Sequence, residues 1–334
     1  SAIEEEVEYL VRGLGYREIT LSSLSTGDYH GLHELVRRLH RRWGEYGVSF
    51  ALPSLKVDSF TLPLLQEISR VRKSGLTFAV ETPELEWQRG INKDVNVEKV
   101  VRILKEARER GWNMAKFYFM IGLPPHLYGG REAEEANSIA SFLQQVRDET
   151  GFKINANVGT FIPKPHTPYQ WSRQLTEQQA LERIQHLRNR FRKTPVRVSY
   201  HSPFISFLEG IISRGDERAG TLALEAYRSG ARLDAWEEHL DTALWRRVID
   251  EADWDVERET CRERGMEEDL PWDKIDTGLE KQYLQKELDK SERGEMTDAC
   301  EFPCDHNCGV CRYGRKPRIG EGSQEDSSAE SNEA

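Results

Sequence analysis

Four cysteines lie within twelve residues near the end of the sequence, in the pattern C-x3-C-x3-C-x2-C. They are Cys300, Cys304, Cys308 and Cys311. Four thiolates this close together suit a tetrahedral zinc ion or an iron–sulfur cluster, and His306 could replace one of them. The alternative is a set of redox disulfides. Because the sequence shows no secretion signal, the cluster favours metal binding in a reducing compartment, the cytoplasm.

A second group of residues that could take part in binding or catalysis lies within or directly after apolar strand patterns. Its members are Thr26, Gly27, Asp28, Glu81, Lys116, Ile121, Gly122, Leu123 and Pro124. Barrel enzymes place their active sites in the loops that follow strands, although any single loop of this kind also fits plain turn chemistry. Glu81 and Lys116 are charged residues in apolar strands. If both face the interior, they pair with each other or with a zwitterionic ligand.

Alternating strand and helix patterns over the first 200 residues must position these loops. Strand patterns start near residues 18, 48, 76, 114, 154 and 196, with a helical pattern between successive strands. Parallel strands need such crossovers, so we expect a β/α barrel or an open doubly wound sheet. The sequence begins on a helical pattern at Ser1 rather than on a strand or a methionine. We therefore expect a fragment whose first strand lies upstream.

The alternation of side chains within the strands favours a barrel with a cavity. One face carries small and polar residues, namely Thr20, Ser22, Ser49, Ala51, Thr77, Ala79, Glu81, Lys116, Tyr118, Met120, Asn155, Asn157 and Gly159. The apolar face is expected to contact the helices. Small polar side chains cannot fill a barrel, so they predict a ligand-sized cavity that can form hydrogen bonds. An open sheet with a solvated polar face is the alternative, but parallel sheets are normally covered on both faces.

The composition limits the classes of partner that the protein can bind. The 334 residues include 47 basic and 57 acidic ones, and this net charge of −10 argues against broad nucleic-acid binding but leaves a local basic patch open. No apolar stretch of about 18 residues occurs, so no membrane span is expected.

We predict a barrel over residues 1–202, a helical extension over 203–290, a metal-binding segment over 291–314 and a disordered tail over 315–334. Within the extension, residues 214–218 (RGDER) fit a helix end and a helix start, and a functional role is the alternative.

Residues 16–171 resemble the core barrel of radical SAM enzymes, in particular the family linked to cobalamin domains. The resemblance is carried by residues 21–29 (LSSLSTGDY), 78–84 (FAVETPE), 90–93 (GINK), 116–124 (KFYFMIGLP) and 161–171 (FIPKPHTPYQW). Later segments also resemble the family, namely 213–220 (SRGDERAG), 234–236 (DAW) and the CGVC sequence at 308–311.

The resemblance implies a partial (β/α)6 barrel in which a [4Fe–4S] cluster cleaves S-adenosylmethionine to a 5′-deoxyadenosyl radical. It implies that residues 26–28 meet the amino group of the cofactor and that Glu81 and Lys116 meet its ribose or methionyl end. Residues 121–124 would then contact the adenine. The family binds its cluster through a C-x3-C-x2-C triad after the first strand. Residues 304–311 match that spacing but lie far beyond the last strand pattern, so the triad is expected upstream of this sequence.

The resemblance also implies partners. They are an electron donor such as ferredoxin or flavodoxin, cobalamin in the full-length protein, and zinc or a second iron–sulfur cluster at the C-terminal cysteines. The resemblance leaves the substrate open, and related enzymes point to RNA or ribosome modification. Without the triad, the fragment alone is expected to be inactive. Two other functions stay open: a zinc-binding interaction module without catalysis, and a metal-free aldolase-like barrel in which Lys116 forms a Schiff base.

Overall fold

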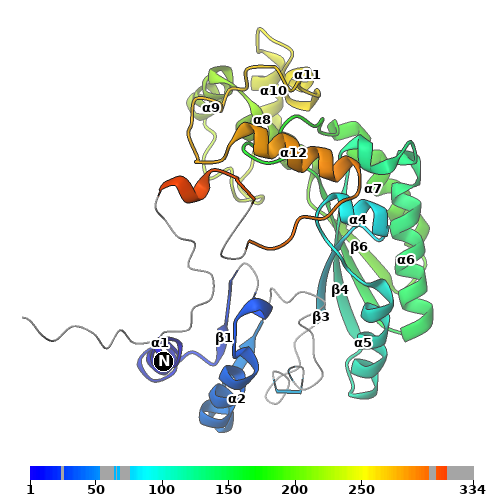
Figure 1. The fold of residues 1–334 in the computed structure, drawn as a ribbon, viewed down its shortest axis with the longest axis vertical. Coiled ribbons are helices and arrows are strands. Elements are labelled where there is room, and N and C mark those ends of the chain that lie inside the picture. Colours follow the sequence, from blue (N-terminus) through cyan, green and yellow to red (C-terminus); the bar gives the residue numbers. More distant parts are fainter. Residues whose placement is uncertain (24–25, 53–63, 65, 68–75, 301–305, 314–334) are drawn as a thin grey trace, which may run out of the picture.

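The structure is a computed structural model that describes residues 1–23, 26–52, 64, 66–67, 76–300 and 306–313 (Figure 1). Its described strands form two parallel sheets. The smaller sheet pairs β1 (Glu18–Thr20) with β2 (Ser49–Ala51). The larger sheet contains β3 (Leu76–Glu81), β4 (Met114–Ile121), β5 (Lys153–Thr160) and β6 (Val196–Tyr200), which are neighbours in chain order.

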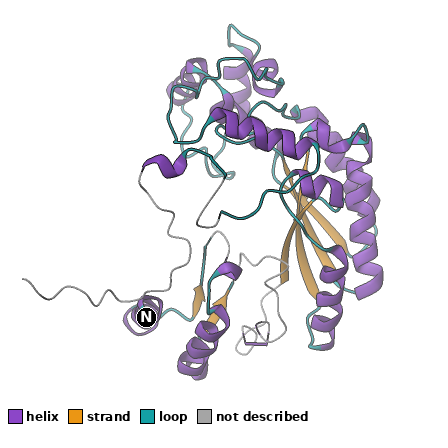
Figure 2. Cartoon of the chain, in the orientation of Figure 1, coloured by secondary structure: helices purple, strands orange, loops and turns teal. Residues whose placement is uncertain are grey.

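The parallel pairing of successive strands agrees with the predicted α/β class. Every predicted strand begins within one residue of the observed start. The finer expectation of a barrel is not confirmed, because the strands of the described residues form a two-stranded and a four-stranded sheet and do not close into a barrel. Three long helices, α5 (Val97–Glu109), α6 (Glu135–Thr150) and α7 (Glu177–Phe191), lie along one face of the larger sheet (Figure 2).

The two faces of the larger sheet differ as the alternation predicts. The side chains that point toward α5, α6 and α7 are buried, namely Leu76, Phe78, Val80, Ala115, Phe117, Phe119, Ile121, Ile154, Ala156 and Val158. The residues between them remain partly exposed, namely Thr77, Ala79, Lys116, Tyr118, Met120, Asn155, Asn157 and Gly159. The apolar face therefore forms the main core, and the small polar face is partly exposed on the side away from these helices.

Local sequence signals account for the helix boundaries at this core. The Asn96 side chain accepts a hydrogen bond from the Lys99 backbone N–H at 2.7 Å and caps α5. Thr176 and Gln179 form the predicted capping box at the start of α7. Both caps satisfy backbone N–H groups that a helix start leaves without partners.

The N-terminal segments form a core of their own around the smaller sheet. They are α1 (Ala2–Glu8), the π-helical turn η1 (Tyr9–Gly13), α2 (Leu32–Trp43) and the 3-10 turn η3 (Gly44–Tyr46). Val7, Leu39, Trp43 and Phe50 are buried in this core. Another side of α2 reaches the main core, where Val36 contacts the cluster that covers β3 and β4.

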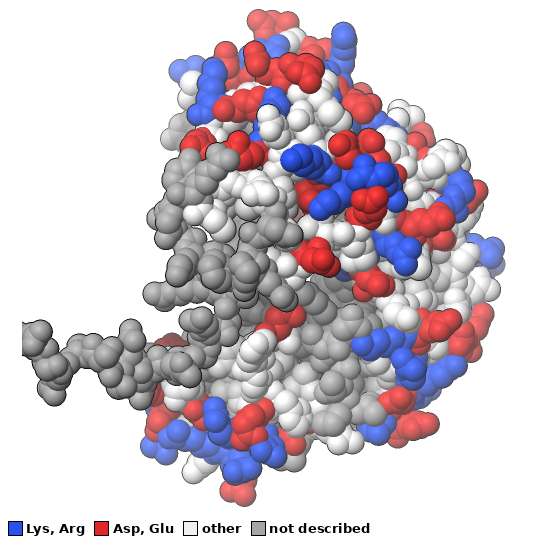
Figure 3. All heavy atoms as spheres, in the orientation of Figure 1, with Lys and Arg blue, Asp and Glu red and all other residues white. Residues whose placement is uncertain are grey.

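Charged side chains of both signs are interspersed on the face of the molecule that Figure 3 shows, and basic ones gather over α2 at the bottom of that view. Three of the basic side chains on α2 form ion pairs, Arg37 with Glu34, Arg38 with Glu4 and Arg42 with Glu8. Nearby carboxylates therefore offset much of this local basic patch. No helix among the described residues is long and apolar enough to cross a membrane.

Residues 203–292 form the helices α8 (Pro203–Arg214), α9 (Glu217–Arg228), α10 (Thr242–Asp250), α11 (Val256–Cys261) and α12 (Lys281–Glu292). The helices α8 to α11 share a separate core that includes Phe207, Ile211 and Trp245. The helix α12 packs elsewhere, through Leu284 and Leu288 against Trp171. The extension lies at the C-terminal ends of β3–β6, where α12 contacts the short helix α4 (Leu85–Gly90) and the 3-10 turn η5 (Pro125–Tyr128). The hydroxyl of Ser291 on α12 lies 3.0 Å from His126 Nε2 and 2.9 Å from the Tyr169 hydroxyl, which joins it to the loops after β4 and β5.

Candidate cofactor site at the C-terminal edge of the sheet

Glu81 ends β3 in a conformation that turns its side chain out of the regular alternation. Its φ is 64°, which is rare for a residue with a Cβ, and the register with β4 shifts between Ala79 and Glu81. The Glu81 carboxylate accepts a hydrogen bond from Lys93 Nζ at 2.9 Å, and both side chains remain partly exposed. The structure thus brings two of the family-like segments, 78–84 and 90–93, together as an ion pair at the edge of the sheet.

Lys116 lies elsewhere on the same polar face. Its register partner on β3 is Thr77, whereas Glu81 stands opposite Phe119, three residues further along β4. This offset is about 10 Å along the strand. The Lys116 ammonium lies over the Tyr118 ring, 4.7 Å from its centroid. The ion pair between Glu81 and Lys116 that the sequence allowed is therefore not formed, because their strand positions keep them apart.

Gly122, the first residue after β4, is held by a buried carboxylate. Its backbone N–H donates to both oxygens of Glu135, at 2.9 and 3.1 Å. The Glu135 side chain is 1% exposed and also accepts hydrogen bonds from Arg183 Nη1 at 2.6 Å and from the Tyr128 hydroxyl. Burial raises the pKa of Glu135, and Arg183, Tyr128 and Gly122 oppose that rise. The turn after β4 is therefore fixed by a side chain of α6.

The same network extends to the loop after β5. Arg183 on α7 and Arg173 in that loop both donate to Glu132. Burial alone would lower the pKa of Arg183, but the carboxylates of Glu135 and Glu132 outweigh it and raise that pKa. Sequence analysis missed these residues, because an acidic residue in the first turn of a helix is normally a surface residue that favours the helix dipole.

The remaining residues of the predicted adenine segment are buried. Ile121 lies in the main core, on the face covered by helices. Leu123 is 1% exposed and packs with Trp87 and Tyr128 in a smaller apolar cluster. Pro124 is buried as well. The apolar side chains of this segment therefore pack against other residues of the chain and support the C-terminal edge of the sheet.

The turn of Thr26, Gly27 and Asp28 follows β1 in the smaller sheet. It forms the 3-10 helix η2 (Thr26–Asp28). Thr26 is buried, and its hydroxyl donates to the Leu21 carbonyl at 3.3 Å and accepts from the Ser23 hydroxyl at 3.2 Å. These residues thus lie at the C-terminal end of a parallel strand, as the sequence predicted, but of a different sheet from Glu81 and Gly122.

The cysteine segment is anchored at two places. Before it, the Thr297 backbone N–H donates to the side-chain oxygen of Asn92 at 2.8 Å, one residue from Lys93. Within it, the Cys308 carbonyl accepts a hydrogen bond from the Glu280 N–H at 2.9 Å. Cys300 and Cys311 are exposed and Cys308 is half-buried, whereas Cys304 lies outside the described residues. The described residues contain no group of three or more His, Cys, Asp or Glu side chains placed to hold a metal ion.

The four-cysteine metal site therefore stays a prediction, and metal analysis of the reduced protein tests it. We expect about one zinc ion, or the iron of one cluster, per chain, and we expect Cys308→Ser to remove it. Cys261→Ser is the matched control, because burial raises the pKa of the Cys261 thiol to about 12 and leaves it a poor thiolate ligand. A metal-free wild-type chain, or equal metal loss in both variants, would contradict the prediction.

Comparison with known proteins supplies a distant relative and no activity. No protein-family model matches the chain. An uncharacterised protein of Methanocaldococcus jannaschii is 24% identical over 243 residues, which cover 70% of this chain and 51% of that protein. The chain thus spans about half the length of this relative.

Proposed function

We propose that this chain is part of a radical SAM enzyme and binds S-adenosylmethionine on the polar face of β3–β6, at their C-terminal ends. The observation that carries the proposal is the asymmetry of the sheet. One face is sealed by three helices, whereas the other presents small and polar side chains that are partly exposed. Ligands of parallel α/β sheets bind at the C-terminal ends of the strands, which is where Glu81 and Gly122 lie.

The chemistry of these side chains fits the ligand. The methionyl end of S-adenosylmethionine is a zwitterion, and the Glu81–Lys93 pair offers one charge of each sign at 2.9 Å. Hydroxyl groups of the ribose need hydrogen-bond partners, and Asn157 and Ser199 lie on the polar face, 3.2 Å apart. A Cβ built on Gly159 would meet only His201 and the Phe119 carbonyl, at 3.9 and 4.0 Å. The surface of the sheet is therefore flat at Gly159, with no side chain projecting from this position.

The roles of this chain's own residues follow from that placement. They bind and orient the nucleoside, and the sealed apolar face keeps water from reaching the site through the sheet. A [4Fe–4S] cluster, when present, supplies the electron that cleaves the bound cofactor. The loop after β1, residues 21–31, contains no cysteine, so we assign no cluster ligand there.

Equilibrium dialysis with S-adenosylmethionine tests the proposal on a pair of charge-removing variants. We expect Glu81→Gln to weaken binding about tenfold, because a charge-assisted contact is lost. Lys116→Gln is expected to change binding less than about twofold, since Lys116 lies about 10 Å along the strand from the register partner of Glu81. Circular dichroism checks that both variants are folded.

Two results would contradict the proposal. One is the absence of binding by the wild-type chain. The other is a larger loss in Lys116→Gln than in Glu81→Gln, which would move the ligand toward the start of β4. Metal content at the cysteines without nucleoside binding would favour the zinc-binding interaction module. Borohydride trapping of a carbonyl substrate on Lys116 would favour the aldolase-like enzyme.

A further inference from the structure

A group of exposed basic side chains lies around β6, the outermost strand of the larger sheet among the described residues. Its members, together called the basic surface, are Lys153, Arg188, Arg192, Lys193 and Arg197. They come from the start of β5, the end of α7, the turn after α7 and β6 itself. The sequence from residue 183 to residue 208 contains no aspartate or glutamate. These elements therefore bring basic residues together without acidic ones.

Helix α7 contributes two of these cations from one side of the helix. Arg188 and Arg192 are four residues apart, so their side chains are neighbours on the helix surface. The Arg188 guanidinium lies over the Tyr200 ring, 5.4 Å from its centroid, and Tyr200 is the last residue of β6. This side of α7 therefore faces β6.

The strands contribute two more cations. Arg197 on β6 stands opposite Asn155 in the parallel register of β5 and β6. Lys153 precedes Asn155 by two residues, so it lies on the same face of the sheet as Arg197. Neighbouring strands are about 4.8 Å apart, which places Lys153 close to Arg197. Neither β5 nor β6 contains an acidic residue.

The turn between α7 and β6 is held by hydrogen bonds of Thr194. Its backbone N–H and its hydroxyl both donate to the Phe191 carbonyl at 3.0 Å, and its hydroxyl accepts from the Val196 N–H at 3.3 Å. These bonds fix the backbone on both sides of Lys193. The structure therefore presents Arg192 and Lys193 on a constrained turn.

Carboxylates on the neighbouring helices have partners outside the basic surface. The acidic residues of α6, α7 and α8 are Glu135, Asp148, Glu149, Glu177, Glu182 and Glu209, and each forms an ion pair or a hydrogen bond elsewhere. At the end of α6, for example, Glu149 pairs with Lys105 at 2.8 Å. No member of the basic surface forms an ion pair within the part of the chain that the structure describes.

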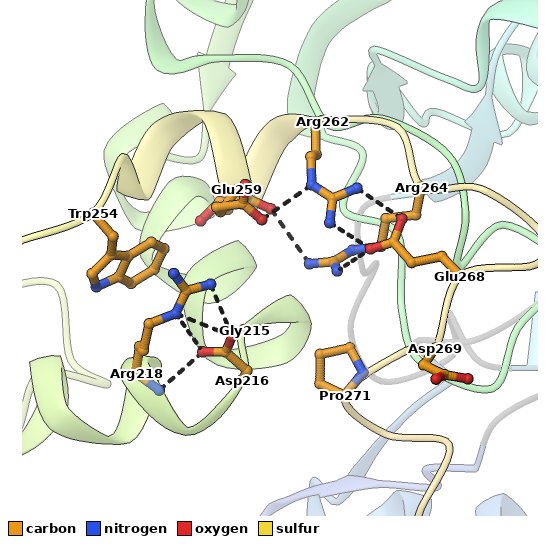
Figure 4. A pocket seen from close by; sticks show the side chains of 11 residues that line it. Gly215, Asp216, Arg218, Trp254, Glu259, Arg262, Arg264, Glu268, Asp269 and Pro271 are labelled. Carbon is orange, nitrogen blue, oxygen red and sulfur yellow. Dashed lines mark hydrogen bonds and ion pairs between the residues drawn. The ribbon is translucent and has the colours of Figure 1, made fainter.

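Arginines of the helical extension show the opposite pattern. Residues 214–218 end α8 and begin α9, as the sequence predicted, and Asp216 there caps α9 and pairs with Arg218 at 2.9 Å. In the same small pocket, Arg262 pairs with Glu259 and with Glu268 (Figure 4). The unpaired cations around β6 are therefore unlike the charged cluster of the extension.

General structural effects account for part of the basic surface. Cations near a helix C-terminus are favoured by the helix dipole, which explains Arg188 and Arg192. A charge on an outer strand prevents pairing with another sheet, which explains Arg197. Neither effect explains Lys193 in the turn or Lys153 on β5. Like charges at this spacing repel each other, so a partner that brings negative charge is favoured here.

We propose that the basic surface binds the phosphate backbone of a single-stranded nucleic acid. Three of its five cations are arginines, whose planar fork donates two parallel hydrogen bonds to a phosphate group. Tyr200 is 37% exposed and offers a ring on which a base can stack. Proteins that bind single strands combine such rings with a basic track along the backbone.

This surface is separate from the nucleoside site. Lys153 is the first residue of β5 and Arg197 the second of β6, whereas Glu81 and Gly122 lie at the C-terminal ends of their strands. The proposal therefore does not depend on the binding of S-adenosylmethionine.

Fluorescence anisotropy with a labelled single strand of about 20 nucleotides, longer than the site of one such module, tests the proposal. If about four phosphates are contacted, binding should weaken roughly fiftyfold between about 50 and 200 mM sodium chloride. A duplex of the same sequence should bind more weakly, because its paired bases cannot stack on Tyr200. Poly-glutamate should displace the labelled strand less effectively than an unlabelled single strand does.

Charge-removing variants locate the contact. We expect the double variant Arg192→Gln, Lys193→Gln to weaken binding at least about tenfold at low salt, because two phosphate contacts are lost. Arg197→Gln on β6 should weaken it severalfold and provides a second, independent variant. Arg37→Gln is the matched control, since Arg37 is an exposed arginine that pairs with Glu34 on α2, and it should leave binding unchanged. Circular dichroism checks that each variant is folded.

Three results would overturn the proposal. The first is no binding of the single strand by the wild-type chain at low salt. The second is a loss in Arg37→Gln as large as in the double variant, since binding would then follow net charge and not this surface. The third is tighter binding of the duplex, or equal displacement by poly-glutamate, which would indicate a duplex or an acidic protein as the partner.

Discussion

Glu135→Ala is expected to lower the free energy of unfolding by at least about 3 kcal/mol, because it removes one partner of a buried ion pair. The substitution leaves the Arg183 guanidinium with Glu132 alone and deprives the Gly122 N–H and the Tyr128 hydroxyl of their acceptor. Each buried donor without an acceptor adds to the loss. Urea denaturation followed by circular dichroism measures the effect.

Two variants separate the buried carboxylate from its surroundings. Glu132→Ala removes a partly exposed carboxylate from the same network, and we expect a loss of about 1 kcal/mol because solvent screens that pair. Glu135→Gln keeps the shape and one acceptor oxygen, so its loss should lie between those of the two alanine variants. Equal losses in Glu132→Ala and Glu135→Ala would show that Glu135 is not the centre of the network.

The Glu135 network also bears on ligand binding, because it holds the turn after β4 at the proposed nucleoside site. Gly122 donates to both oxygens of Glu135, and glutamine replaces one of them with an amide NH2 group. We therefore expect Glu135→Gln to shift Gly122 and to weaken S-adenosylmethionine binding even in conditions where the variant is fully folded. Unchanged binding by folded Glu135→Gln would limit the network to a role in stability.

Gly122→Ala is the second large effect that we expect, with a loss of about 2–4 kcal/mol in the free energy of unfolding. Two costs add at this position. Gly122 has a φ of 78°, a conformation that residues with a Cβ adopt rarely. A Cβ built there would also approach Leu175 Cγ and Cδ1 to 2.5 and 2.6 Å, so the buried Leu175 side chain would have to move.

Gly129 offers a matched control in the same loop. Its φ is 53°, also in the left-handed region, but nothing lies within 4 Å of a Cβ built there. Gly129→Ala therefore carries the conformational cost alone, about 1 kcal/mol. The difference between the two variants measures the contact with Leu175. A loss in Gly129→Ala as large as that in Gly122→Ala would mean that packing at Leu175 contributes nothing.

Much of the fold could be predicted because it depends on residues that are close in sequence. The strand starts follow from runs of alternating apolar residues, and the caps of α5 and α7 follow from Asn96 and Thr176 three residues before their hydrogen-bond partners. The alternation also indicated which face of each strand contacts the helices. Closure of the strands into a barrel could not be predicted in the same way, because it depends on the pairing of strands that are far apart in the sequence.

The candidate site was predicted in part, for the same reason. Glu81 and Gly122 were identified because Glu81 ends one apolar strand and Gly122 follows the next, and parallel strands bring such positions to one edge. The partners of these two residues could not be predicted. Lys93 lies 12 residues from Glu81, beyond the helix α4, and Glu135 lies 13 residues from Gly122, beyond the 3-10 turn η5. The offset between Glu81 and Lys116 depends on the strand register and on the shift that follows Ala79.

The sequence by itself determined the order of strands and helices, the sealed and the polar face of the larger sheet, and the places where loops carry charge, because hydrophobic periodicity and capping act within one or two turns of chain. Only the tertiary structure decided which charges meet. It paired Glu81 with Lys93, buried Glu135 beneath Gly122, and joined the Arg214 guanidinium to the Thr260 carbonyl. Such contacts join segments up to 50 residues apart, and the packing of helices against the sheet selects them among many equally charged alternatives.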